Sequence, residues 1–578
     1  MTEYKALTGY PSIDKPWLKY YSEEQINAAL PECSLYDYLW DCNKDHLDYC
    51  AINYFGHKIT FKKLFEMIDE TAKAFIAIGV KEKEIVPIVS VSTVTSVVCF
   101  YALNKIGAVS DFINVLSEEK DFILLFKEVN AKTVVTLDLF EPKVIAASKM
   151  SGVKTVVTFG INKEMPMMVN IGYMLKMAGK IPNNPHQNNV ISWNDFIKQG
   201  KGIKVSSRYK NPDEMCLLTH TGGTTGEPKA VMLSDKGMNA VANYYKQCFT
   251  HKRGEIWANV MIPFVVYGIL NCLHMPLTLG LTTVIIPKFD GKEWKKYLKK
   301  YSINYILAVP SYVDVFYENE DYKDLDLNCL KLCGVGGDGM TVDKEERLNA
   351  FFSSHGANIE VLKGYGMTEV CATAVTGLVG INKLGSVGIP LIHNNVMIYD
   401  SEKESELPYK EIGEICLQSP SRMIGYLKDE AATESLFKIH PDGTTWLHTG
   451  DLGYMDSDGF LFLAGRIKRV ILTTKDGVAY KVFPNIPESI IESHDSVSQS
   501  CIVGVKQGEN QVLQAHIVIS DLSNADQVES ELRELCDKEL PSYSRPTYYK
   551  FHNNLPLTSA GKVDYRALEK LAEEENDG

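Results

Sequence analysis

The fold of this chain is best predicted from one stretch, Thr219-His220-Thr221-Gly222-Gly223-Thr224-Thr225-Gly226-Glu227-Pro228-Lys229-Ala230-Val231. An apolar run at 215–218 precedes it, which predicts a strand followed by a loop. Glycines let backbone N–H groups approach phosphate oxygens, threonine hydroxyls add hydrogen bonds, and a lysine adds positive charge. The residues expected to bind phosphate are Thr221, Gly222, Gly223, Thr224, Thr225, Gly226 and Lys229.

This loop does not follow the common G-x-x-x-x-G-K-[ST] pattern of phosphate-binding loops. Its lysine, Lys229, follows Pro228 and is followed by Ala230, so the required spacing is not met. Taken alone, the stretch allows two interpretations. It is a phosphate loop of another kind, or it is a flexible polar linker between two strands.

Four further motifs follow the loop in order. They are Tyr365-Gly366-Met367-Thr368-Glu369, Thr449-Gly450-Asp451, Gly465-Arg466-Ile467-Lys468 and Leu555-Pro556-Leu557-Thr558-Ser559-Ala560-Gly561-Lys562. Together with the loop, they make the chain similar to the adenylate-forming superfamily. That superfamily contains acyl-CoA synthetases, peptide-synthetase adenylation domains and firefly-type luciferases. The resemblance runs from residue 219 to residue 562.

The chain has 578 residues, which is too long for one hydrophobic core, so several domains are expected. In the first 200 residues, an amphipathic helix at 61–77 alternates with short apolar strands at 85–91, 133–136 and 155–158. This alternation predicts parallel sheets flanked by helices.

Further along, buried strands are predicted at 282–286 and 304–309, and short strands and turns from 388 to 463 predict a small β-subdomain. A compact α+β unit is predicted after Lys468. Its expected elements are helices near 486–493 and 528–540 and strands at 501–505 and 514–519.

The resemblance implies a fold that is α/β and α+β. It implies a large N-terminal domain, residues 1–467, of stacked parallel-sheet subdomains plus the small β-subdomain. A small, mobile α+β domain, residues 468–578, would carry the catalytic lysine.

The charge and cysteine content exclude several classes of protein. A net charge of −13 argues against a general nucleic-acid binder, which would show a basic face. The 13 cysteines form no C-x-x-C pair, so a zinc ribbon is not expected. Because their number is odd and the protein is large, reduced thiols in the cytoplasm are predicted. Residues 1–20 lack the apolar core of a signal peptide.

Residues 256–287 contain no Asp, Glu, Lys or Arg, and such a length could span a bilayer. Prolines and glycines interrupt the segment, however. We therefore predict a buried core segment beside the acyl pocket and no transmembrane segment.

The resemblance implies a reaction in two steps. A carboxylate attacks the α-phosphate of ATP to give an acyl-adenylate and pyrophosphate, and a thiol then takes the acyl group. Lys562 is expected to stabilise the first transition state, in which two anions meet. The alternative for Lys562 is an ordinary solvated lysine.

The same resemblance assigns roles to the other motifs. Glu369 would hold Mg²⁺ through hard oxygen atoms, and Thr368 would hydrogen-bond the α-phosphate. Tyr365, flanked by Gly364 and Gly366, would stack on adenine. Without the family context, Thr368 would be interpreted as a helix N-cap beside the charged Glu369. Tyr365 would be interpreted as an ordinary tyrosine of the hydrophobic core.

On the nucleoside side, Asp451 would accept hydrogen bonds from the ribose hydroxyls, and Arg466 would add a contact to ribose or phosphate. Lys468 would be the hinge residue, with a surface lysine as the alternative. The glycine-rich turn Gly336-Gly337-Asp338 resembles the turn beside adenine, although Asp338 stands where many members have Ala.

Several positions depart from the family pattern. Ala230 replaces a common Gly, and an aromatic–His pair is missing from the segment Pro263-Phe264-Val265-Val266-Tyr267-Gly268. The family's P-x-E-I-E appears as Pro484-Asn485-Ile486-Pro487-Glu488, without its first Glu. The gating of the acyl pocket and the identity of the acceptor are therefore the open parts of this interpretation.

The stretch 263–275 has no acidic residue to hold an amino group, so a fatty or aryl acid is favoured over an amino acid. Candidate pocket residues are Val266, Tyr267, Gly268, Gly336 and Cys371. Coenzyme A is the expected acceptor. The alternatives are a separate carrier protein, since only sixteen residues follow Lys562, and a non-catalytic adenylate-binding protein.

Overall fold

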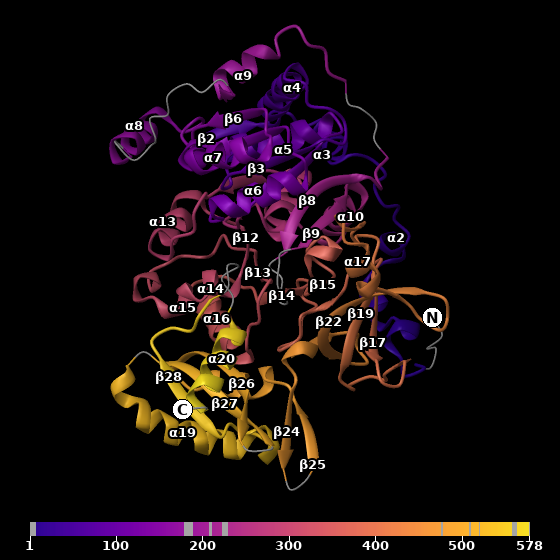
Figure 1. The fold of residues 1–578 in the computed structure, drawn as a ribbon, viewed down its shortest axis with the longest axis vertical. Helices are drawn as coiled ribbons and strands as arrows, with labels where there is room; N and C mark the ends of the chain where they lie inside the picture. Colours follow the sequence, from indigo (N-terminus) through magenta and orange to yellow (C-terminus); the bar gives the residue numbers. More distant parts are fainter. Residues whose placement is uncertain are drawn as a thin grey trace.

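The chain folds into a large N-terminal part built on stacked sheets and a small C-terminal part at the opposite end of the molecule (Figure 1). The computed structural model describes residues 7–177, 189–206, 211–221, 229–475, 478–507, 510–519, 521–557 and 563–576. Parallel sheets flanked by helices, with a small antiparallel subdomain, confirm the predicted α/β and α+β fold class.

The first sheet has the strand order β20-β9-β8-β4-β3-β5-β6-β7. Its strands are β3 (Ile85–Val89), β4 (Val109–Ile113), β5 (Thr133–Leu137), β6 (Thr155–Phe159), β7 (Val190–Ser192), β8 (Met215–Thr221), β9 (Lys229–Ser234) and β20 (Gly425–Tyr426). Strands from β8 to β7 pair in parallel, whereas β8 and β9 pair antiparallel as two sides of a hairpin. The three strands predicted in the first 200 residues are confirmed as β3, β5 and β6.

The predicted amphipathic helix is confirmed as α4 (Phe61–Ala77). The hydroxyl of Thr60 caps it by accepting a hydrogen bond from the N–H of Lys63 at 3.2 Å. Apolar side chains at helical spacing face the core. The buried ones include Leu64, Ile68, Ala72 and Phe75.

The second sheet has the strand order β16-β15-β14-β13-β12-β10-β11-β1-β2. Its strands are β1 (Cys50–Tyr54), β2 (His57–Thr60), β10 (Ile256–Asn259), β11 (Thr282–Ile285), β12 (Tyr305–Ala308), β13 (Leu332–Val335), β14 (Val361–Tyr365), β15 (Val375–Thr376) and β16 (Ile389–Pro390). The strands predicted at 282–286 and 304–309 are confirmed as β11 and β12. Strands β11, β10, β12, β13 and β14 are parallel, so their carboxyl ends meet at one edge of the sheet.

Helices cover these two sheets (Figure 1). Besides α4, the helices of the N-terminal part include α1 (Pro11–Asp14), α2 (Glu23–Ile26), α3 (Leu35–Asn43), α5 (Val94–Lys105), α6 (Glu119–Glu128), α7 (Glu141–Ser151), α8 (Met167–Lys176), α9 (Trp193–Gln199), α10 (Asp235–Cys248), α13 (Gly291–Tyr301), α14 (Pro310–Val313), α15 (Val315–Glu318), α16 (Val342–Ser354) and α17 (Glu430–Leu436).

The uncharged segment 256–287 is a core segment, as predicted. It forms β10, the short helix α11 (Val266–Ile269), a π-helical turn (Leu270–His274), α12 (Met275–Thr278) and β11, and most of its side chains are buried. Among the residues that the structure describes, no helix has both the length and the apolar character needed to cross a membrane.

His274, at the end of the π-helical turn, is a buried histidine that should make folding sensitive to acid. Its Nδ1 lies 3.0 Å from the hydroxyl of Tyr101 and its Nε2 lies 3.0 Å from Oδ1 of Asn239. Complete burial lowers the pKa of His274 from 6.5 to about 3. Between these two values the unfolded chain binds a proton that the folded chain does not, so stability present above pH 6.5 is lost as pH falls.

We expect the free energy of unfolding to drop by about 2 kcal/mol through this group between about pH 7 and about pH 5. Urea unfolding of the parent and of His274→Gln at both pH values measures it. Equal acid sensitivity of the two proteins would show that another group is responsible.

The third sheet forms the small β-subdomain predicted at 388–463. Its antiparallel strands have the order β18-β17-β19-β22-β21, and β23 also pairs with β22. The strands are β17 (Asn395–Asp400), β18 (Ser405–Glu406), β19 (Gly413–Gln418), β21 (Phe437–Ile439), β22 (Thr445–Met455) and β23 (Leu461–Arg466).

The C-terminal part has its own core. Its apolar clusters draw all their described members from residues 471–572. Its elements are the hairpin β24 (Ile471–Lys475) and β25 (Val478–Val482), the sheet β26 (Val497–Gln507), β27 (Asn510–Ile519) and β28 (Tyr548–His552), and the helices α18 (Asn485–Glu492), α19 (Ala525–Glu539) and α20 (Tyr565–Asn576). The helices and strands predicted after Lys468 are confirmed, while the domain boundary at 467/468 stays a prediction.

All thirteen cysteines lie in described parts of the chain and carry free thiols. This agrees with the reduced state predicted from their odd number and the size of the protein.

Candidate active site

A large cleft, with a volume of about 3500 Å³, lies between the N-terminal and C-terminal parts. The carboxyl ends of β13 and β14 open into it, and so does the β8–β9 hairpin. Residues of the C-terminal part line the other side, among them Ser498, Gln499, Asn554 and Tyr565. Open parallel sheets bind ligands outside the carboxyl ends of their strands, so this cleft is the candidate active site.

The β8–β9 hairpin places the two ends of the predicted phosphate loop at the cleft. Thr221 pairs with Lys229, and both residues line the cleft. The ammonium of Lys229 lies 4.8 Å from the centre of the Tyr426 ring, a cation–π contact that holds the lysine at the start of β9. The predicted phosphate ligands Gly222, Gly223, Thr224, Thr225 and Gly226 lie outside the described residues.

Tyr365 ends β14 and connects two of the sequence motifs. Its hydroxyl donates a 2.7 Å hydrogen bond to Oδ2 of Asp451. Burial, and the carboxylate of Asp451, raise the pKa of Tyr365 well above its usual value, so it stays a donor. The next residue, Gly366, has no room for a side chain, because a Cβ there would lie 1.9 Å from the carbonyl oxygen of Ala372.

Asp451 and Arg466 face each other across β22 and β23. They are a directly opposed pair of the two strands, and Nε of Arg466 lies 2.8 Å from Oδ1 of Asp451. The carboxylate is buried, whereas the guanidinium is half exposed toward the cleft that both residues line. Tyr365, Asp451 and Arg466 are thus joined by one hydrogen bond and one ion pair.

Glu369 lies in a single 3₁₀ turn, Thr368–Val370, at the bottom of the same cleft. Oε1 of Glu369 accepts a 2.6 Å hydrogen bond from the hydroxyl of Tyr426. Burial raises the pKa of Glu369, and the Tyr426 hydrogen bond partly opposes that shift. Tyr426 carries no local motif and lies 57 residues from Glu369 in sequence, so sequence analysis did not find it.

The turn after Glu369 is strained. Cys371 has φ +53° and Ala372 has φ +74°, both in the left-handed region that favours glycine. Two such residues in succession cost on the order of 1–3 kcal/mol each and are typical of ligand-binding turns. Their position beside Glu369 is consistent with a functional turn.

The glycine-rich turn after β13 forms the wall opposite Tyr267. A Cβ on Gly336 would lie 3.3 Å from the carbonyl oxygen of Gly364, and Gly337 adopts φ +81°. Asp338 is exposed at the edge of the cleft, where its Oδ1 accepts a 2.9 Å hydrogen bond from the N–H of Gly339. The Asp338 side chain therefore shapes its own turn.

Three of the predicted pocket residues, Val266, Tyr267 and Gly336, line the cleft, and the Tyr267 hydroxyl donates to the carbonyl of Ala308 at 3.3 Å. Gly268 and Cys371 lie behind the lining. A Cβ at Gly268 would come 2.1 Å from the carbonyl oxygen of Ile262, so this glycine permits a tight turn. Cys371 is fully buried and packs toward α10.

Lys562 lies outside the described residues, but described residues close to it in the chain line the cleft. Leu557 and Val563 form an isolated antiparallel bridge on either side of it, and the N–H of Asp564 donates to the carbonyl of Pro556 at 2.8 Å. Val563 and Asp564 both line the cleft.

The connection between the two parts passes through an exposed 3₁₀ turn, Ile467–Arg469. Before the turn, Arg466 is bound to Asp451 of the N-terminal part. After it, Arg469 forms a close ion pair with Glu488 of α18, and its guanidinium lies 5.3 Å from the centre of the Tyr565 ring. Lys468 is exposed between these two anchored arginines.

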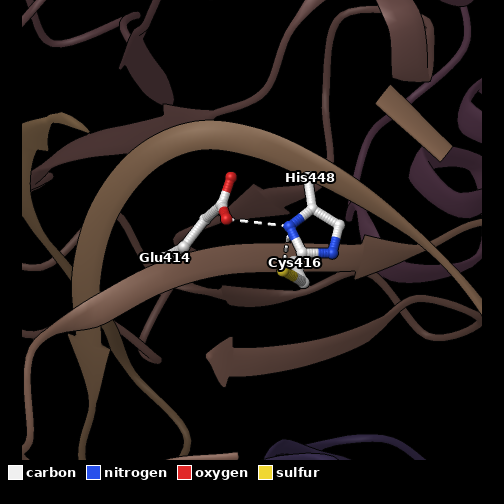
Figure 2. A group of neighbouring side chains, drawn as sticks. All are labelled: Glu414, Cys416 and His448. Carbon is white, nitrogen blue, oxygen red and sulfur yellow. Dashed lines mark hydrogen bonds and ion pairs between the residues drawn. The ribbon is translucent and has the colours of Figure 1, made fainter. Parts of the chain in front are cut away.

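A cluster that sequence analysis did not find lies on β19 and β22 (Figure 2). Oε2 of Glu414 lies 2.8 Å from Nδ1 of His448, and Sγ of Cys416 lies 3.6 Å from the same nitrogen. Burial acts to raise the pKa of Glu414, but the His448 hydrogen bond and charge lower it, so the carboxylate is ionised. The spacing of Glu414 and Cys416 on β19 is ordinary strand alternation, which is why no motif signalled them.

Comparison with known proteins identifies the family to which the chain belongs. A family model described as AMP-binding enzyme matches residues 39–427, more than half of the chain. A second, described as AMP-binding enzyme C-terminal domain, matches residues 487–562.

Among curated relatives, the long-chain-fatty-acid–CoA ligase of Bacillus subtilis (strain 168) is 27% identical over 575 residues, which cover 97% of this chain and 98% of that protein. The long-chain-fatty-acid–CoA ligase of Escherichia coli O157:H7 is 24% identical over 576 residues, which cover 96% of this chain and 98% of that protein.

Among solved structures, the anthranilate CoA ligase AuaEII in complex with anthranoyl-AMP has a TM-score of 0.81 at 19% identity, covering 96% of this chain and 100% of that one. ATP-bound MatB from Rhodopseudomonas palustris has a TM-score of 0.80 at 20% identity, covering 94% and 100%. These two likenesses concern the fold. The family models, together with the five sequence motifs, show that the chain belongs to the AMP-binding enzyme family of the adenylate-forming superfamily.

Proposed function

We propose that this protein activates a carboxylic acid with ATP, releases pyrophosphate, and transfers the acyl group to coenzyme A. The observation that carries the proposal is the convergence of Tyr365, Asp451, Arg466 and Glu369 on one cleft. Bound MgATP requires three kinds of protein group. They are hydrogen-bond acceptors for the ribose hydroxyls, a cation near the nucleotide, and a carboxylate for the metal ion.

The nucleoside would bind at the carboxyl ends of β13 and β14. The Gly336-Gly337-Asp338 turn and the Tyr365 ring are the walls proposed for adenine, because both line the cleft and a side chain on Gly336 would crowd the carbonyl oxygen of Gly364. Asp451 would accept hydrogen bonds from the ribose hydroxyls. Since Arg466 and Tyr365 already hold that carboxylate from one side, it is oriented before ATP arrives.

The triphosphate would then lie along the β8–β9 hairpin, toward Lys229. Thr221 and Lys229 mark the two ends of the loop proposed to hold the β- and γ-phosphates. Thr368, one residue before Glu369, is placed to hydrogen-bond the α-phosphate.

Glu369 fits the requirements of a Mg²⁺ ligand. It is a buried carboxylate that faces the cleft, and one of its oxygens is oriented by the Tyr426 hydroxyl. Bound Mg²⁺ would offset the negative charge of the phosphates. Burial raises the pKa of Glu369, and a cation bound beside the carboxylate would favour its ionised form.

Replacing Glu369 by Gln should weaken the use of MgATP roughly tenfold at low Mg²⁺, because an amide is a poor ligand for a hard cation. As pH falls toward the raised pKa of Glu369, the parent should need more Mg²⁺ while the Gln variant should not. Initial rates measured against Mg²⁺ concentration at several pH values test this, with exposed Glu434→Gln as the control. Identical curves for parent and Glu369→Gln would contradict a metal role.

The acid would occupy the inner, apolar end of the cleft. That end is lined by side chains from α10, β10, β12 and the segment after β10. They include Tyr245, Phe249, Trp257, Met261 and Leu307. A wall of this kind favours burial of a hydrocarbon chain or an aromatic ring, and it agrees with the fatty-acid and aryl-acid ligases among the similar proteins.

The deciding experiment measures pyrophosphate release across a panel of straight-chain fatty acids, aryl acids and amino acids, with and without coenzyme A. We expect release with fatty or aryl acids and stoichiometric loss of the coenzyme A thiol. Adenylate formation without coenzyme A consumption would replace that acceptor by a carrier protein. ATP binding without pyrophosphate release for every acid would contradict a ligase.

A further inference from the structure

Asp451 lies in an irregular stretch of β22 that a regular strand would not contain. On β19, Glu414 is paired with Leu452 and Cys416 with His448. Three residues of β22, Thr449, Gly450 and Asp451, therefore stand opposite the single residue Ile415. Such a bulge re-aims the side chains it carries, and here it presents Asp451 to the cleft.

In a bulge, some backbone N–H and C=O groups lose their hydrogen-bond partners on the neighbouring strand. Each such group that is buried without another partner destabilises the fold. Here side chains provide the missing hydrogen bonds. Oε1 of Glu414 accepts a 3.0 Å hydrogen bond from the N–H of Gly450, which has φ +70°. The hydroxyl of Thr449 donates to the carbonyl of Ile415 at 2.7 Å and accepts from the N–H of Asp451 at 3.0 Å.

Glu414 is itself fixed by a second layer. Its other oxygen, Oε2, accepts from Nδ1 of His448, and Nε2 of His448 lies 2.9 Å from Nε2 of His440 (Figure 2 shows the first contact). All three side chains are buried. The carboxylate therefore has one oxygen on the bulge and one on a histidine pair, and it cannot rotate away without breaking both contacts.

We infer that Glu414 is a positioning residue for the nucleotide: it holds the Thr449–Asp451 bulge so that Asp451 meets the ribose. The inference rests on the nucleotide role proposed for Asp451. Glu414 acts through the backbone of Gly450 and does not contact the nucleotide itself.

The same side chains have the donor atoms of a metal site, since Glu414, Cys416 and His448 each offer a ligand atom within 4.8 Å of the others. Their hydrogen bonds argue for the positioning role. Both oxygens of Glu414 and both ring nitrogens of His448 already have protein partners, so no polar atom is left for an ion to satisfy.

A double-mutant cycle in MgATP binding tests the inference. The variants are Glu414→Ala, Asp451→Asn and the double variant, with binding measured by calorimetry in the absence of any acid. Glu414→Ala should weaken MgATP binding roughly tenfold, or about 1.4 kcal/mol. In the Asp451→Asn background it should have no further effect, because a disordered bulge then has no carboxylate to misplace.

Glu406→Ala is the matched control. Glu406 lies in the same subdomain, where its two oxygens accept from the N–H and hydroxyl of Ser12 at 2.8 and 2.6 Å, so its loss removes comparable hydrogen bonds away from the bulge. It should leave MgATP affinity unchanged. Glu414→Gln should regain most of the affinity, because its carbonyl can accept from Gly450 while its amide donates to the other tautomer of His448.

The outcomes separate the possible failures. If Asp451→Asn alone leaves MgATP affinity unchanged, the nucleotide role of Asp451 is wrong and the inference fails with it. If the losses from Glu414→Ala and Asp451→Asn add, or Glu414→Gln is as impaired as Glu414→Ala, Glu414 is only structural. Stoichiometric zinc in the purified protein that is lost in Glu414→Ala would replace the inference by a metal site. Failure to find an acid substrate leaves this binding test intact.

Discussion

Replacing Lys562 by Ala is expected to lower acyl-adenylate formation by roughly 10²–10³-fold, the usual effect of losing one preorganised charged donor. In the first step a carboxylate and the α-phosphate, both negative, must approach each other. A lysine ammonium between them offsets that repulsion most strongly as negative charge gathers at phosphorus. Val563 and Asp564, the next residues in the chain, line the cleft that contains Asp451.

The second half-reaction should distinguish this role from general damage. Coenzyme A acylation from supplied acyl-adenylate should be nearly unchanged in Lys562→Ala, because the domain rotation implied by the family carries this lysine away before thiol attack. Lys570→Ala, an exposed lysine of α20, is the control and should affect neither step. Equal loss in both steps, or no loss in either, would show that Lys562 is not the adenylation lysine.

Local motifs predicted those parts of the site that a few consecutive residues create. The Thr449-Gly450-Asp451 and Gly465-Arg466 motifs predicted both members of the Asp451–Arg466 pair, and the structure adds that they face each other across two strands. The predicted strands β3, β5, β6, β11 and β12 were found for a similar reason. Buried parallel strands are short apolar runs that a sequence displays directly.

Contacts between distant segments could not be predicted in this way. Tyr426 reaches Glu369 because β20 pairs with β9, and Glu414 reaches Gly450 because β22 bulges opposite β19. Register and bulges are properties of a pair of strands, and neither strand alone signals them. The direction of the Cys371 side chain is a further example, since the left-handed turn that contains this residue points its thiol toward α10.

The link between the two parts is built as two fixed ends with a short free segment between them. Arg466 is bound to Asp451 on one side, and Arg469 is bound to Glu488 on the other. Glu488 also accepts a 2.7 Å hydrogen bond from the N–H of Ile502, so Arg469 is anchored in the C-terminal core. Any rotation of one part against the other must therefore be absorbed at Ile467 and Lys468.

Replacing Lys468 by Pro should consequently stop acyl transfer while adenylate formation persists. Proline fixes φ near −65°, which a residue inside a 3₁₀ turn already has, so the arrangement described here should be retained. A second orientation of the C-terminal part needs a different backbone conformation at residue 468, and proline prevents that conformation. ATP-dependent adenylate formation should stay within about threefold of the parent, while coenzyme A acylation from supplied adenylate should fall at least roughly 10²-fold.

Lys468→Ala separates the backbone effect from the side-chain effect. It removes the ammonium but leaves φ free, so it should retain acyl transfer if Lys468 serves as a hinge. A Lys468→Ala variant as defective in transfer as Lys468→Pro would assign the side chain a direct role. Equal loss of adenylation and transfer in Lys468→Pro would mean that the turn between Arg466 and Arg469 is needed for the first step itself. Rotation about this turn would then not explain how one cleft serves two reactions.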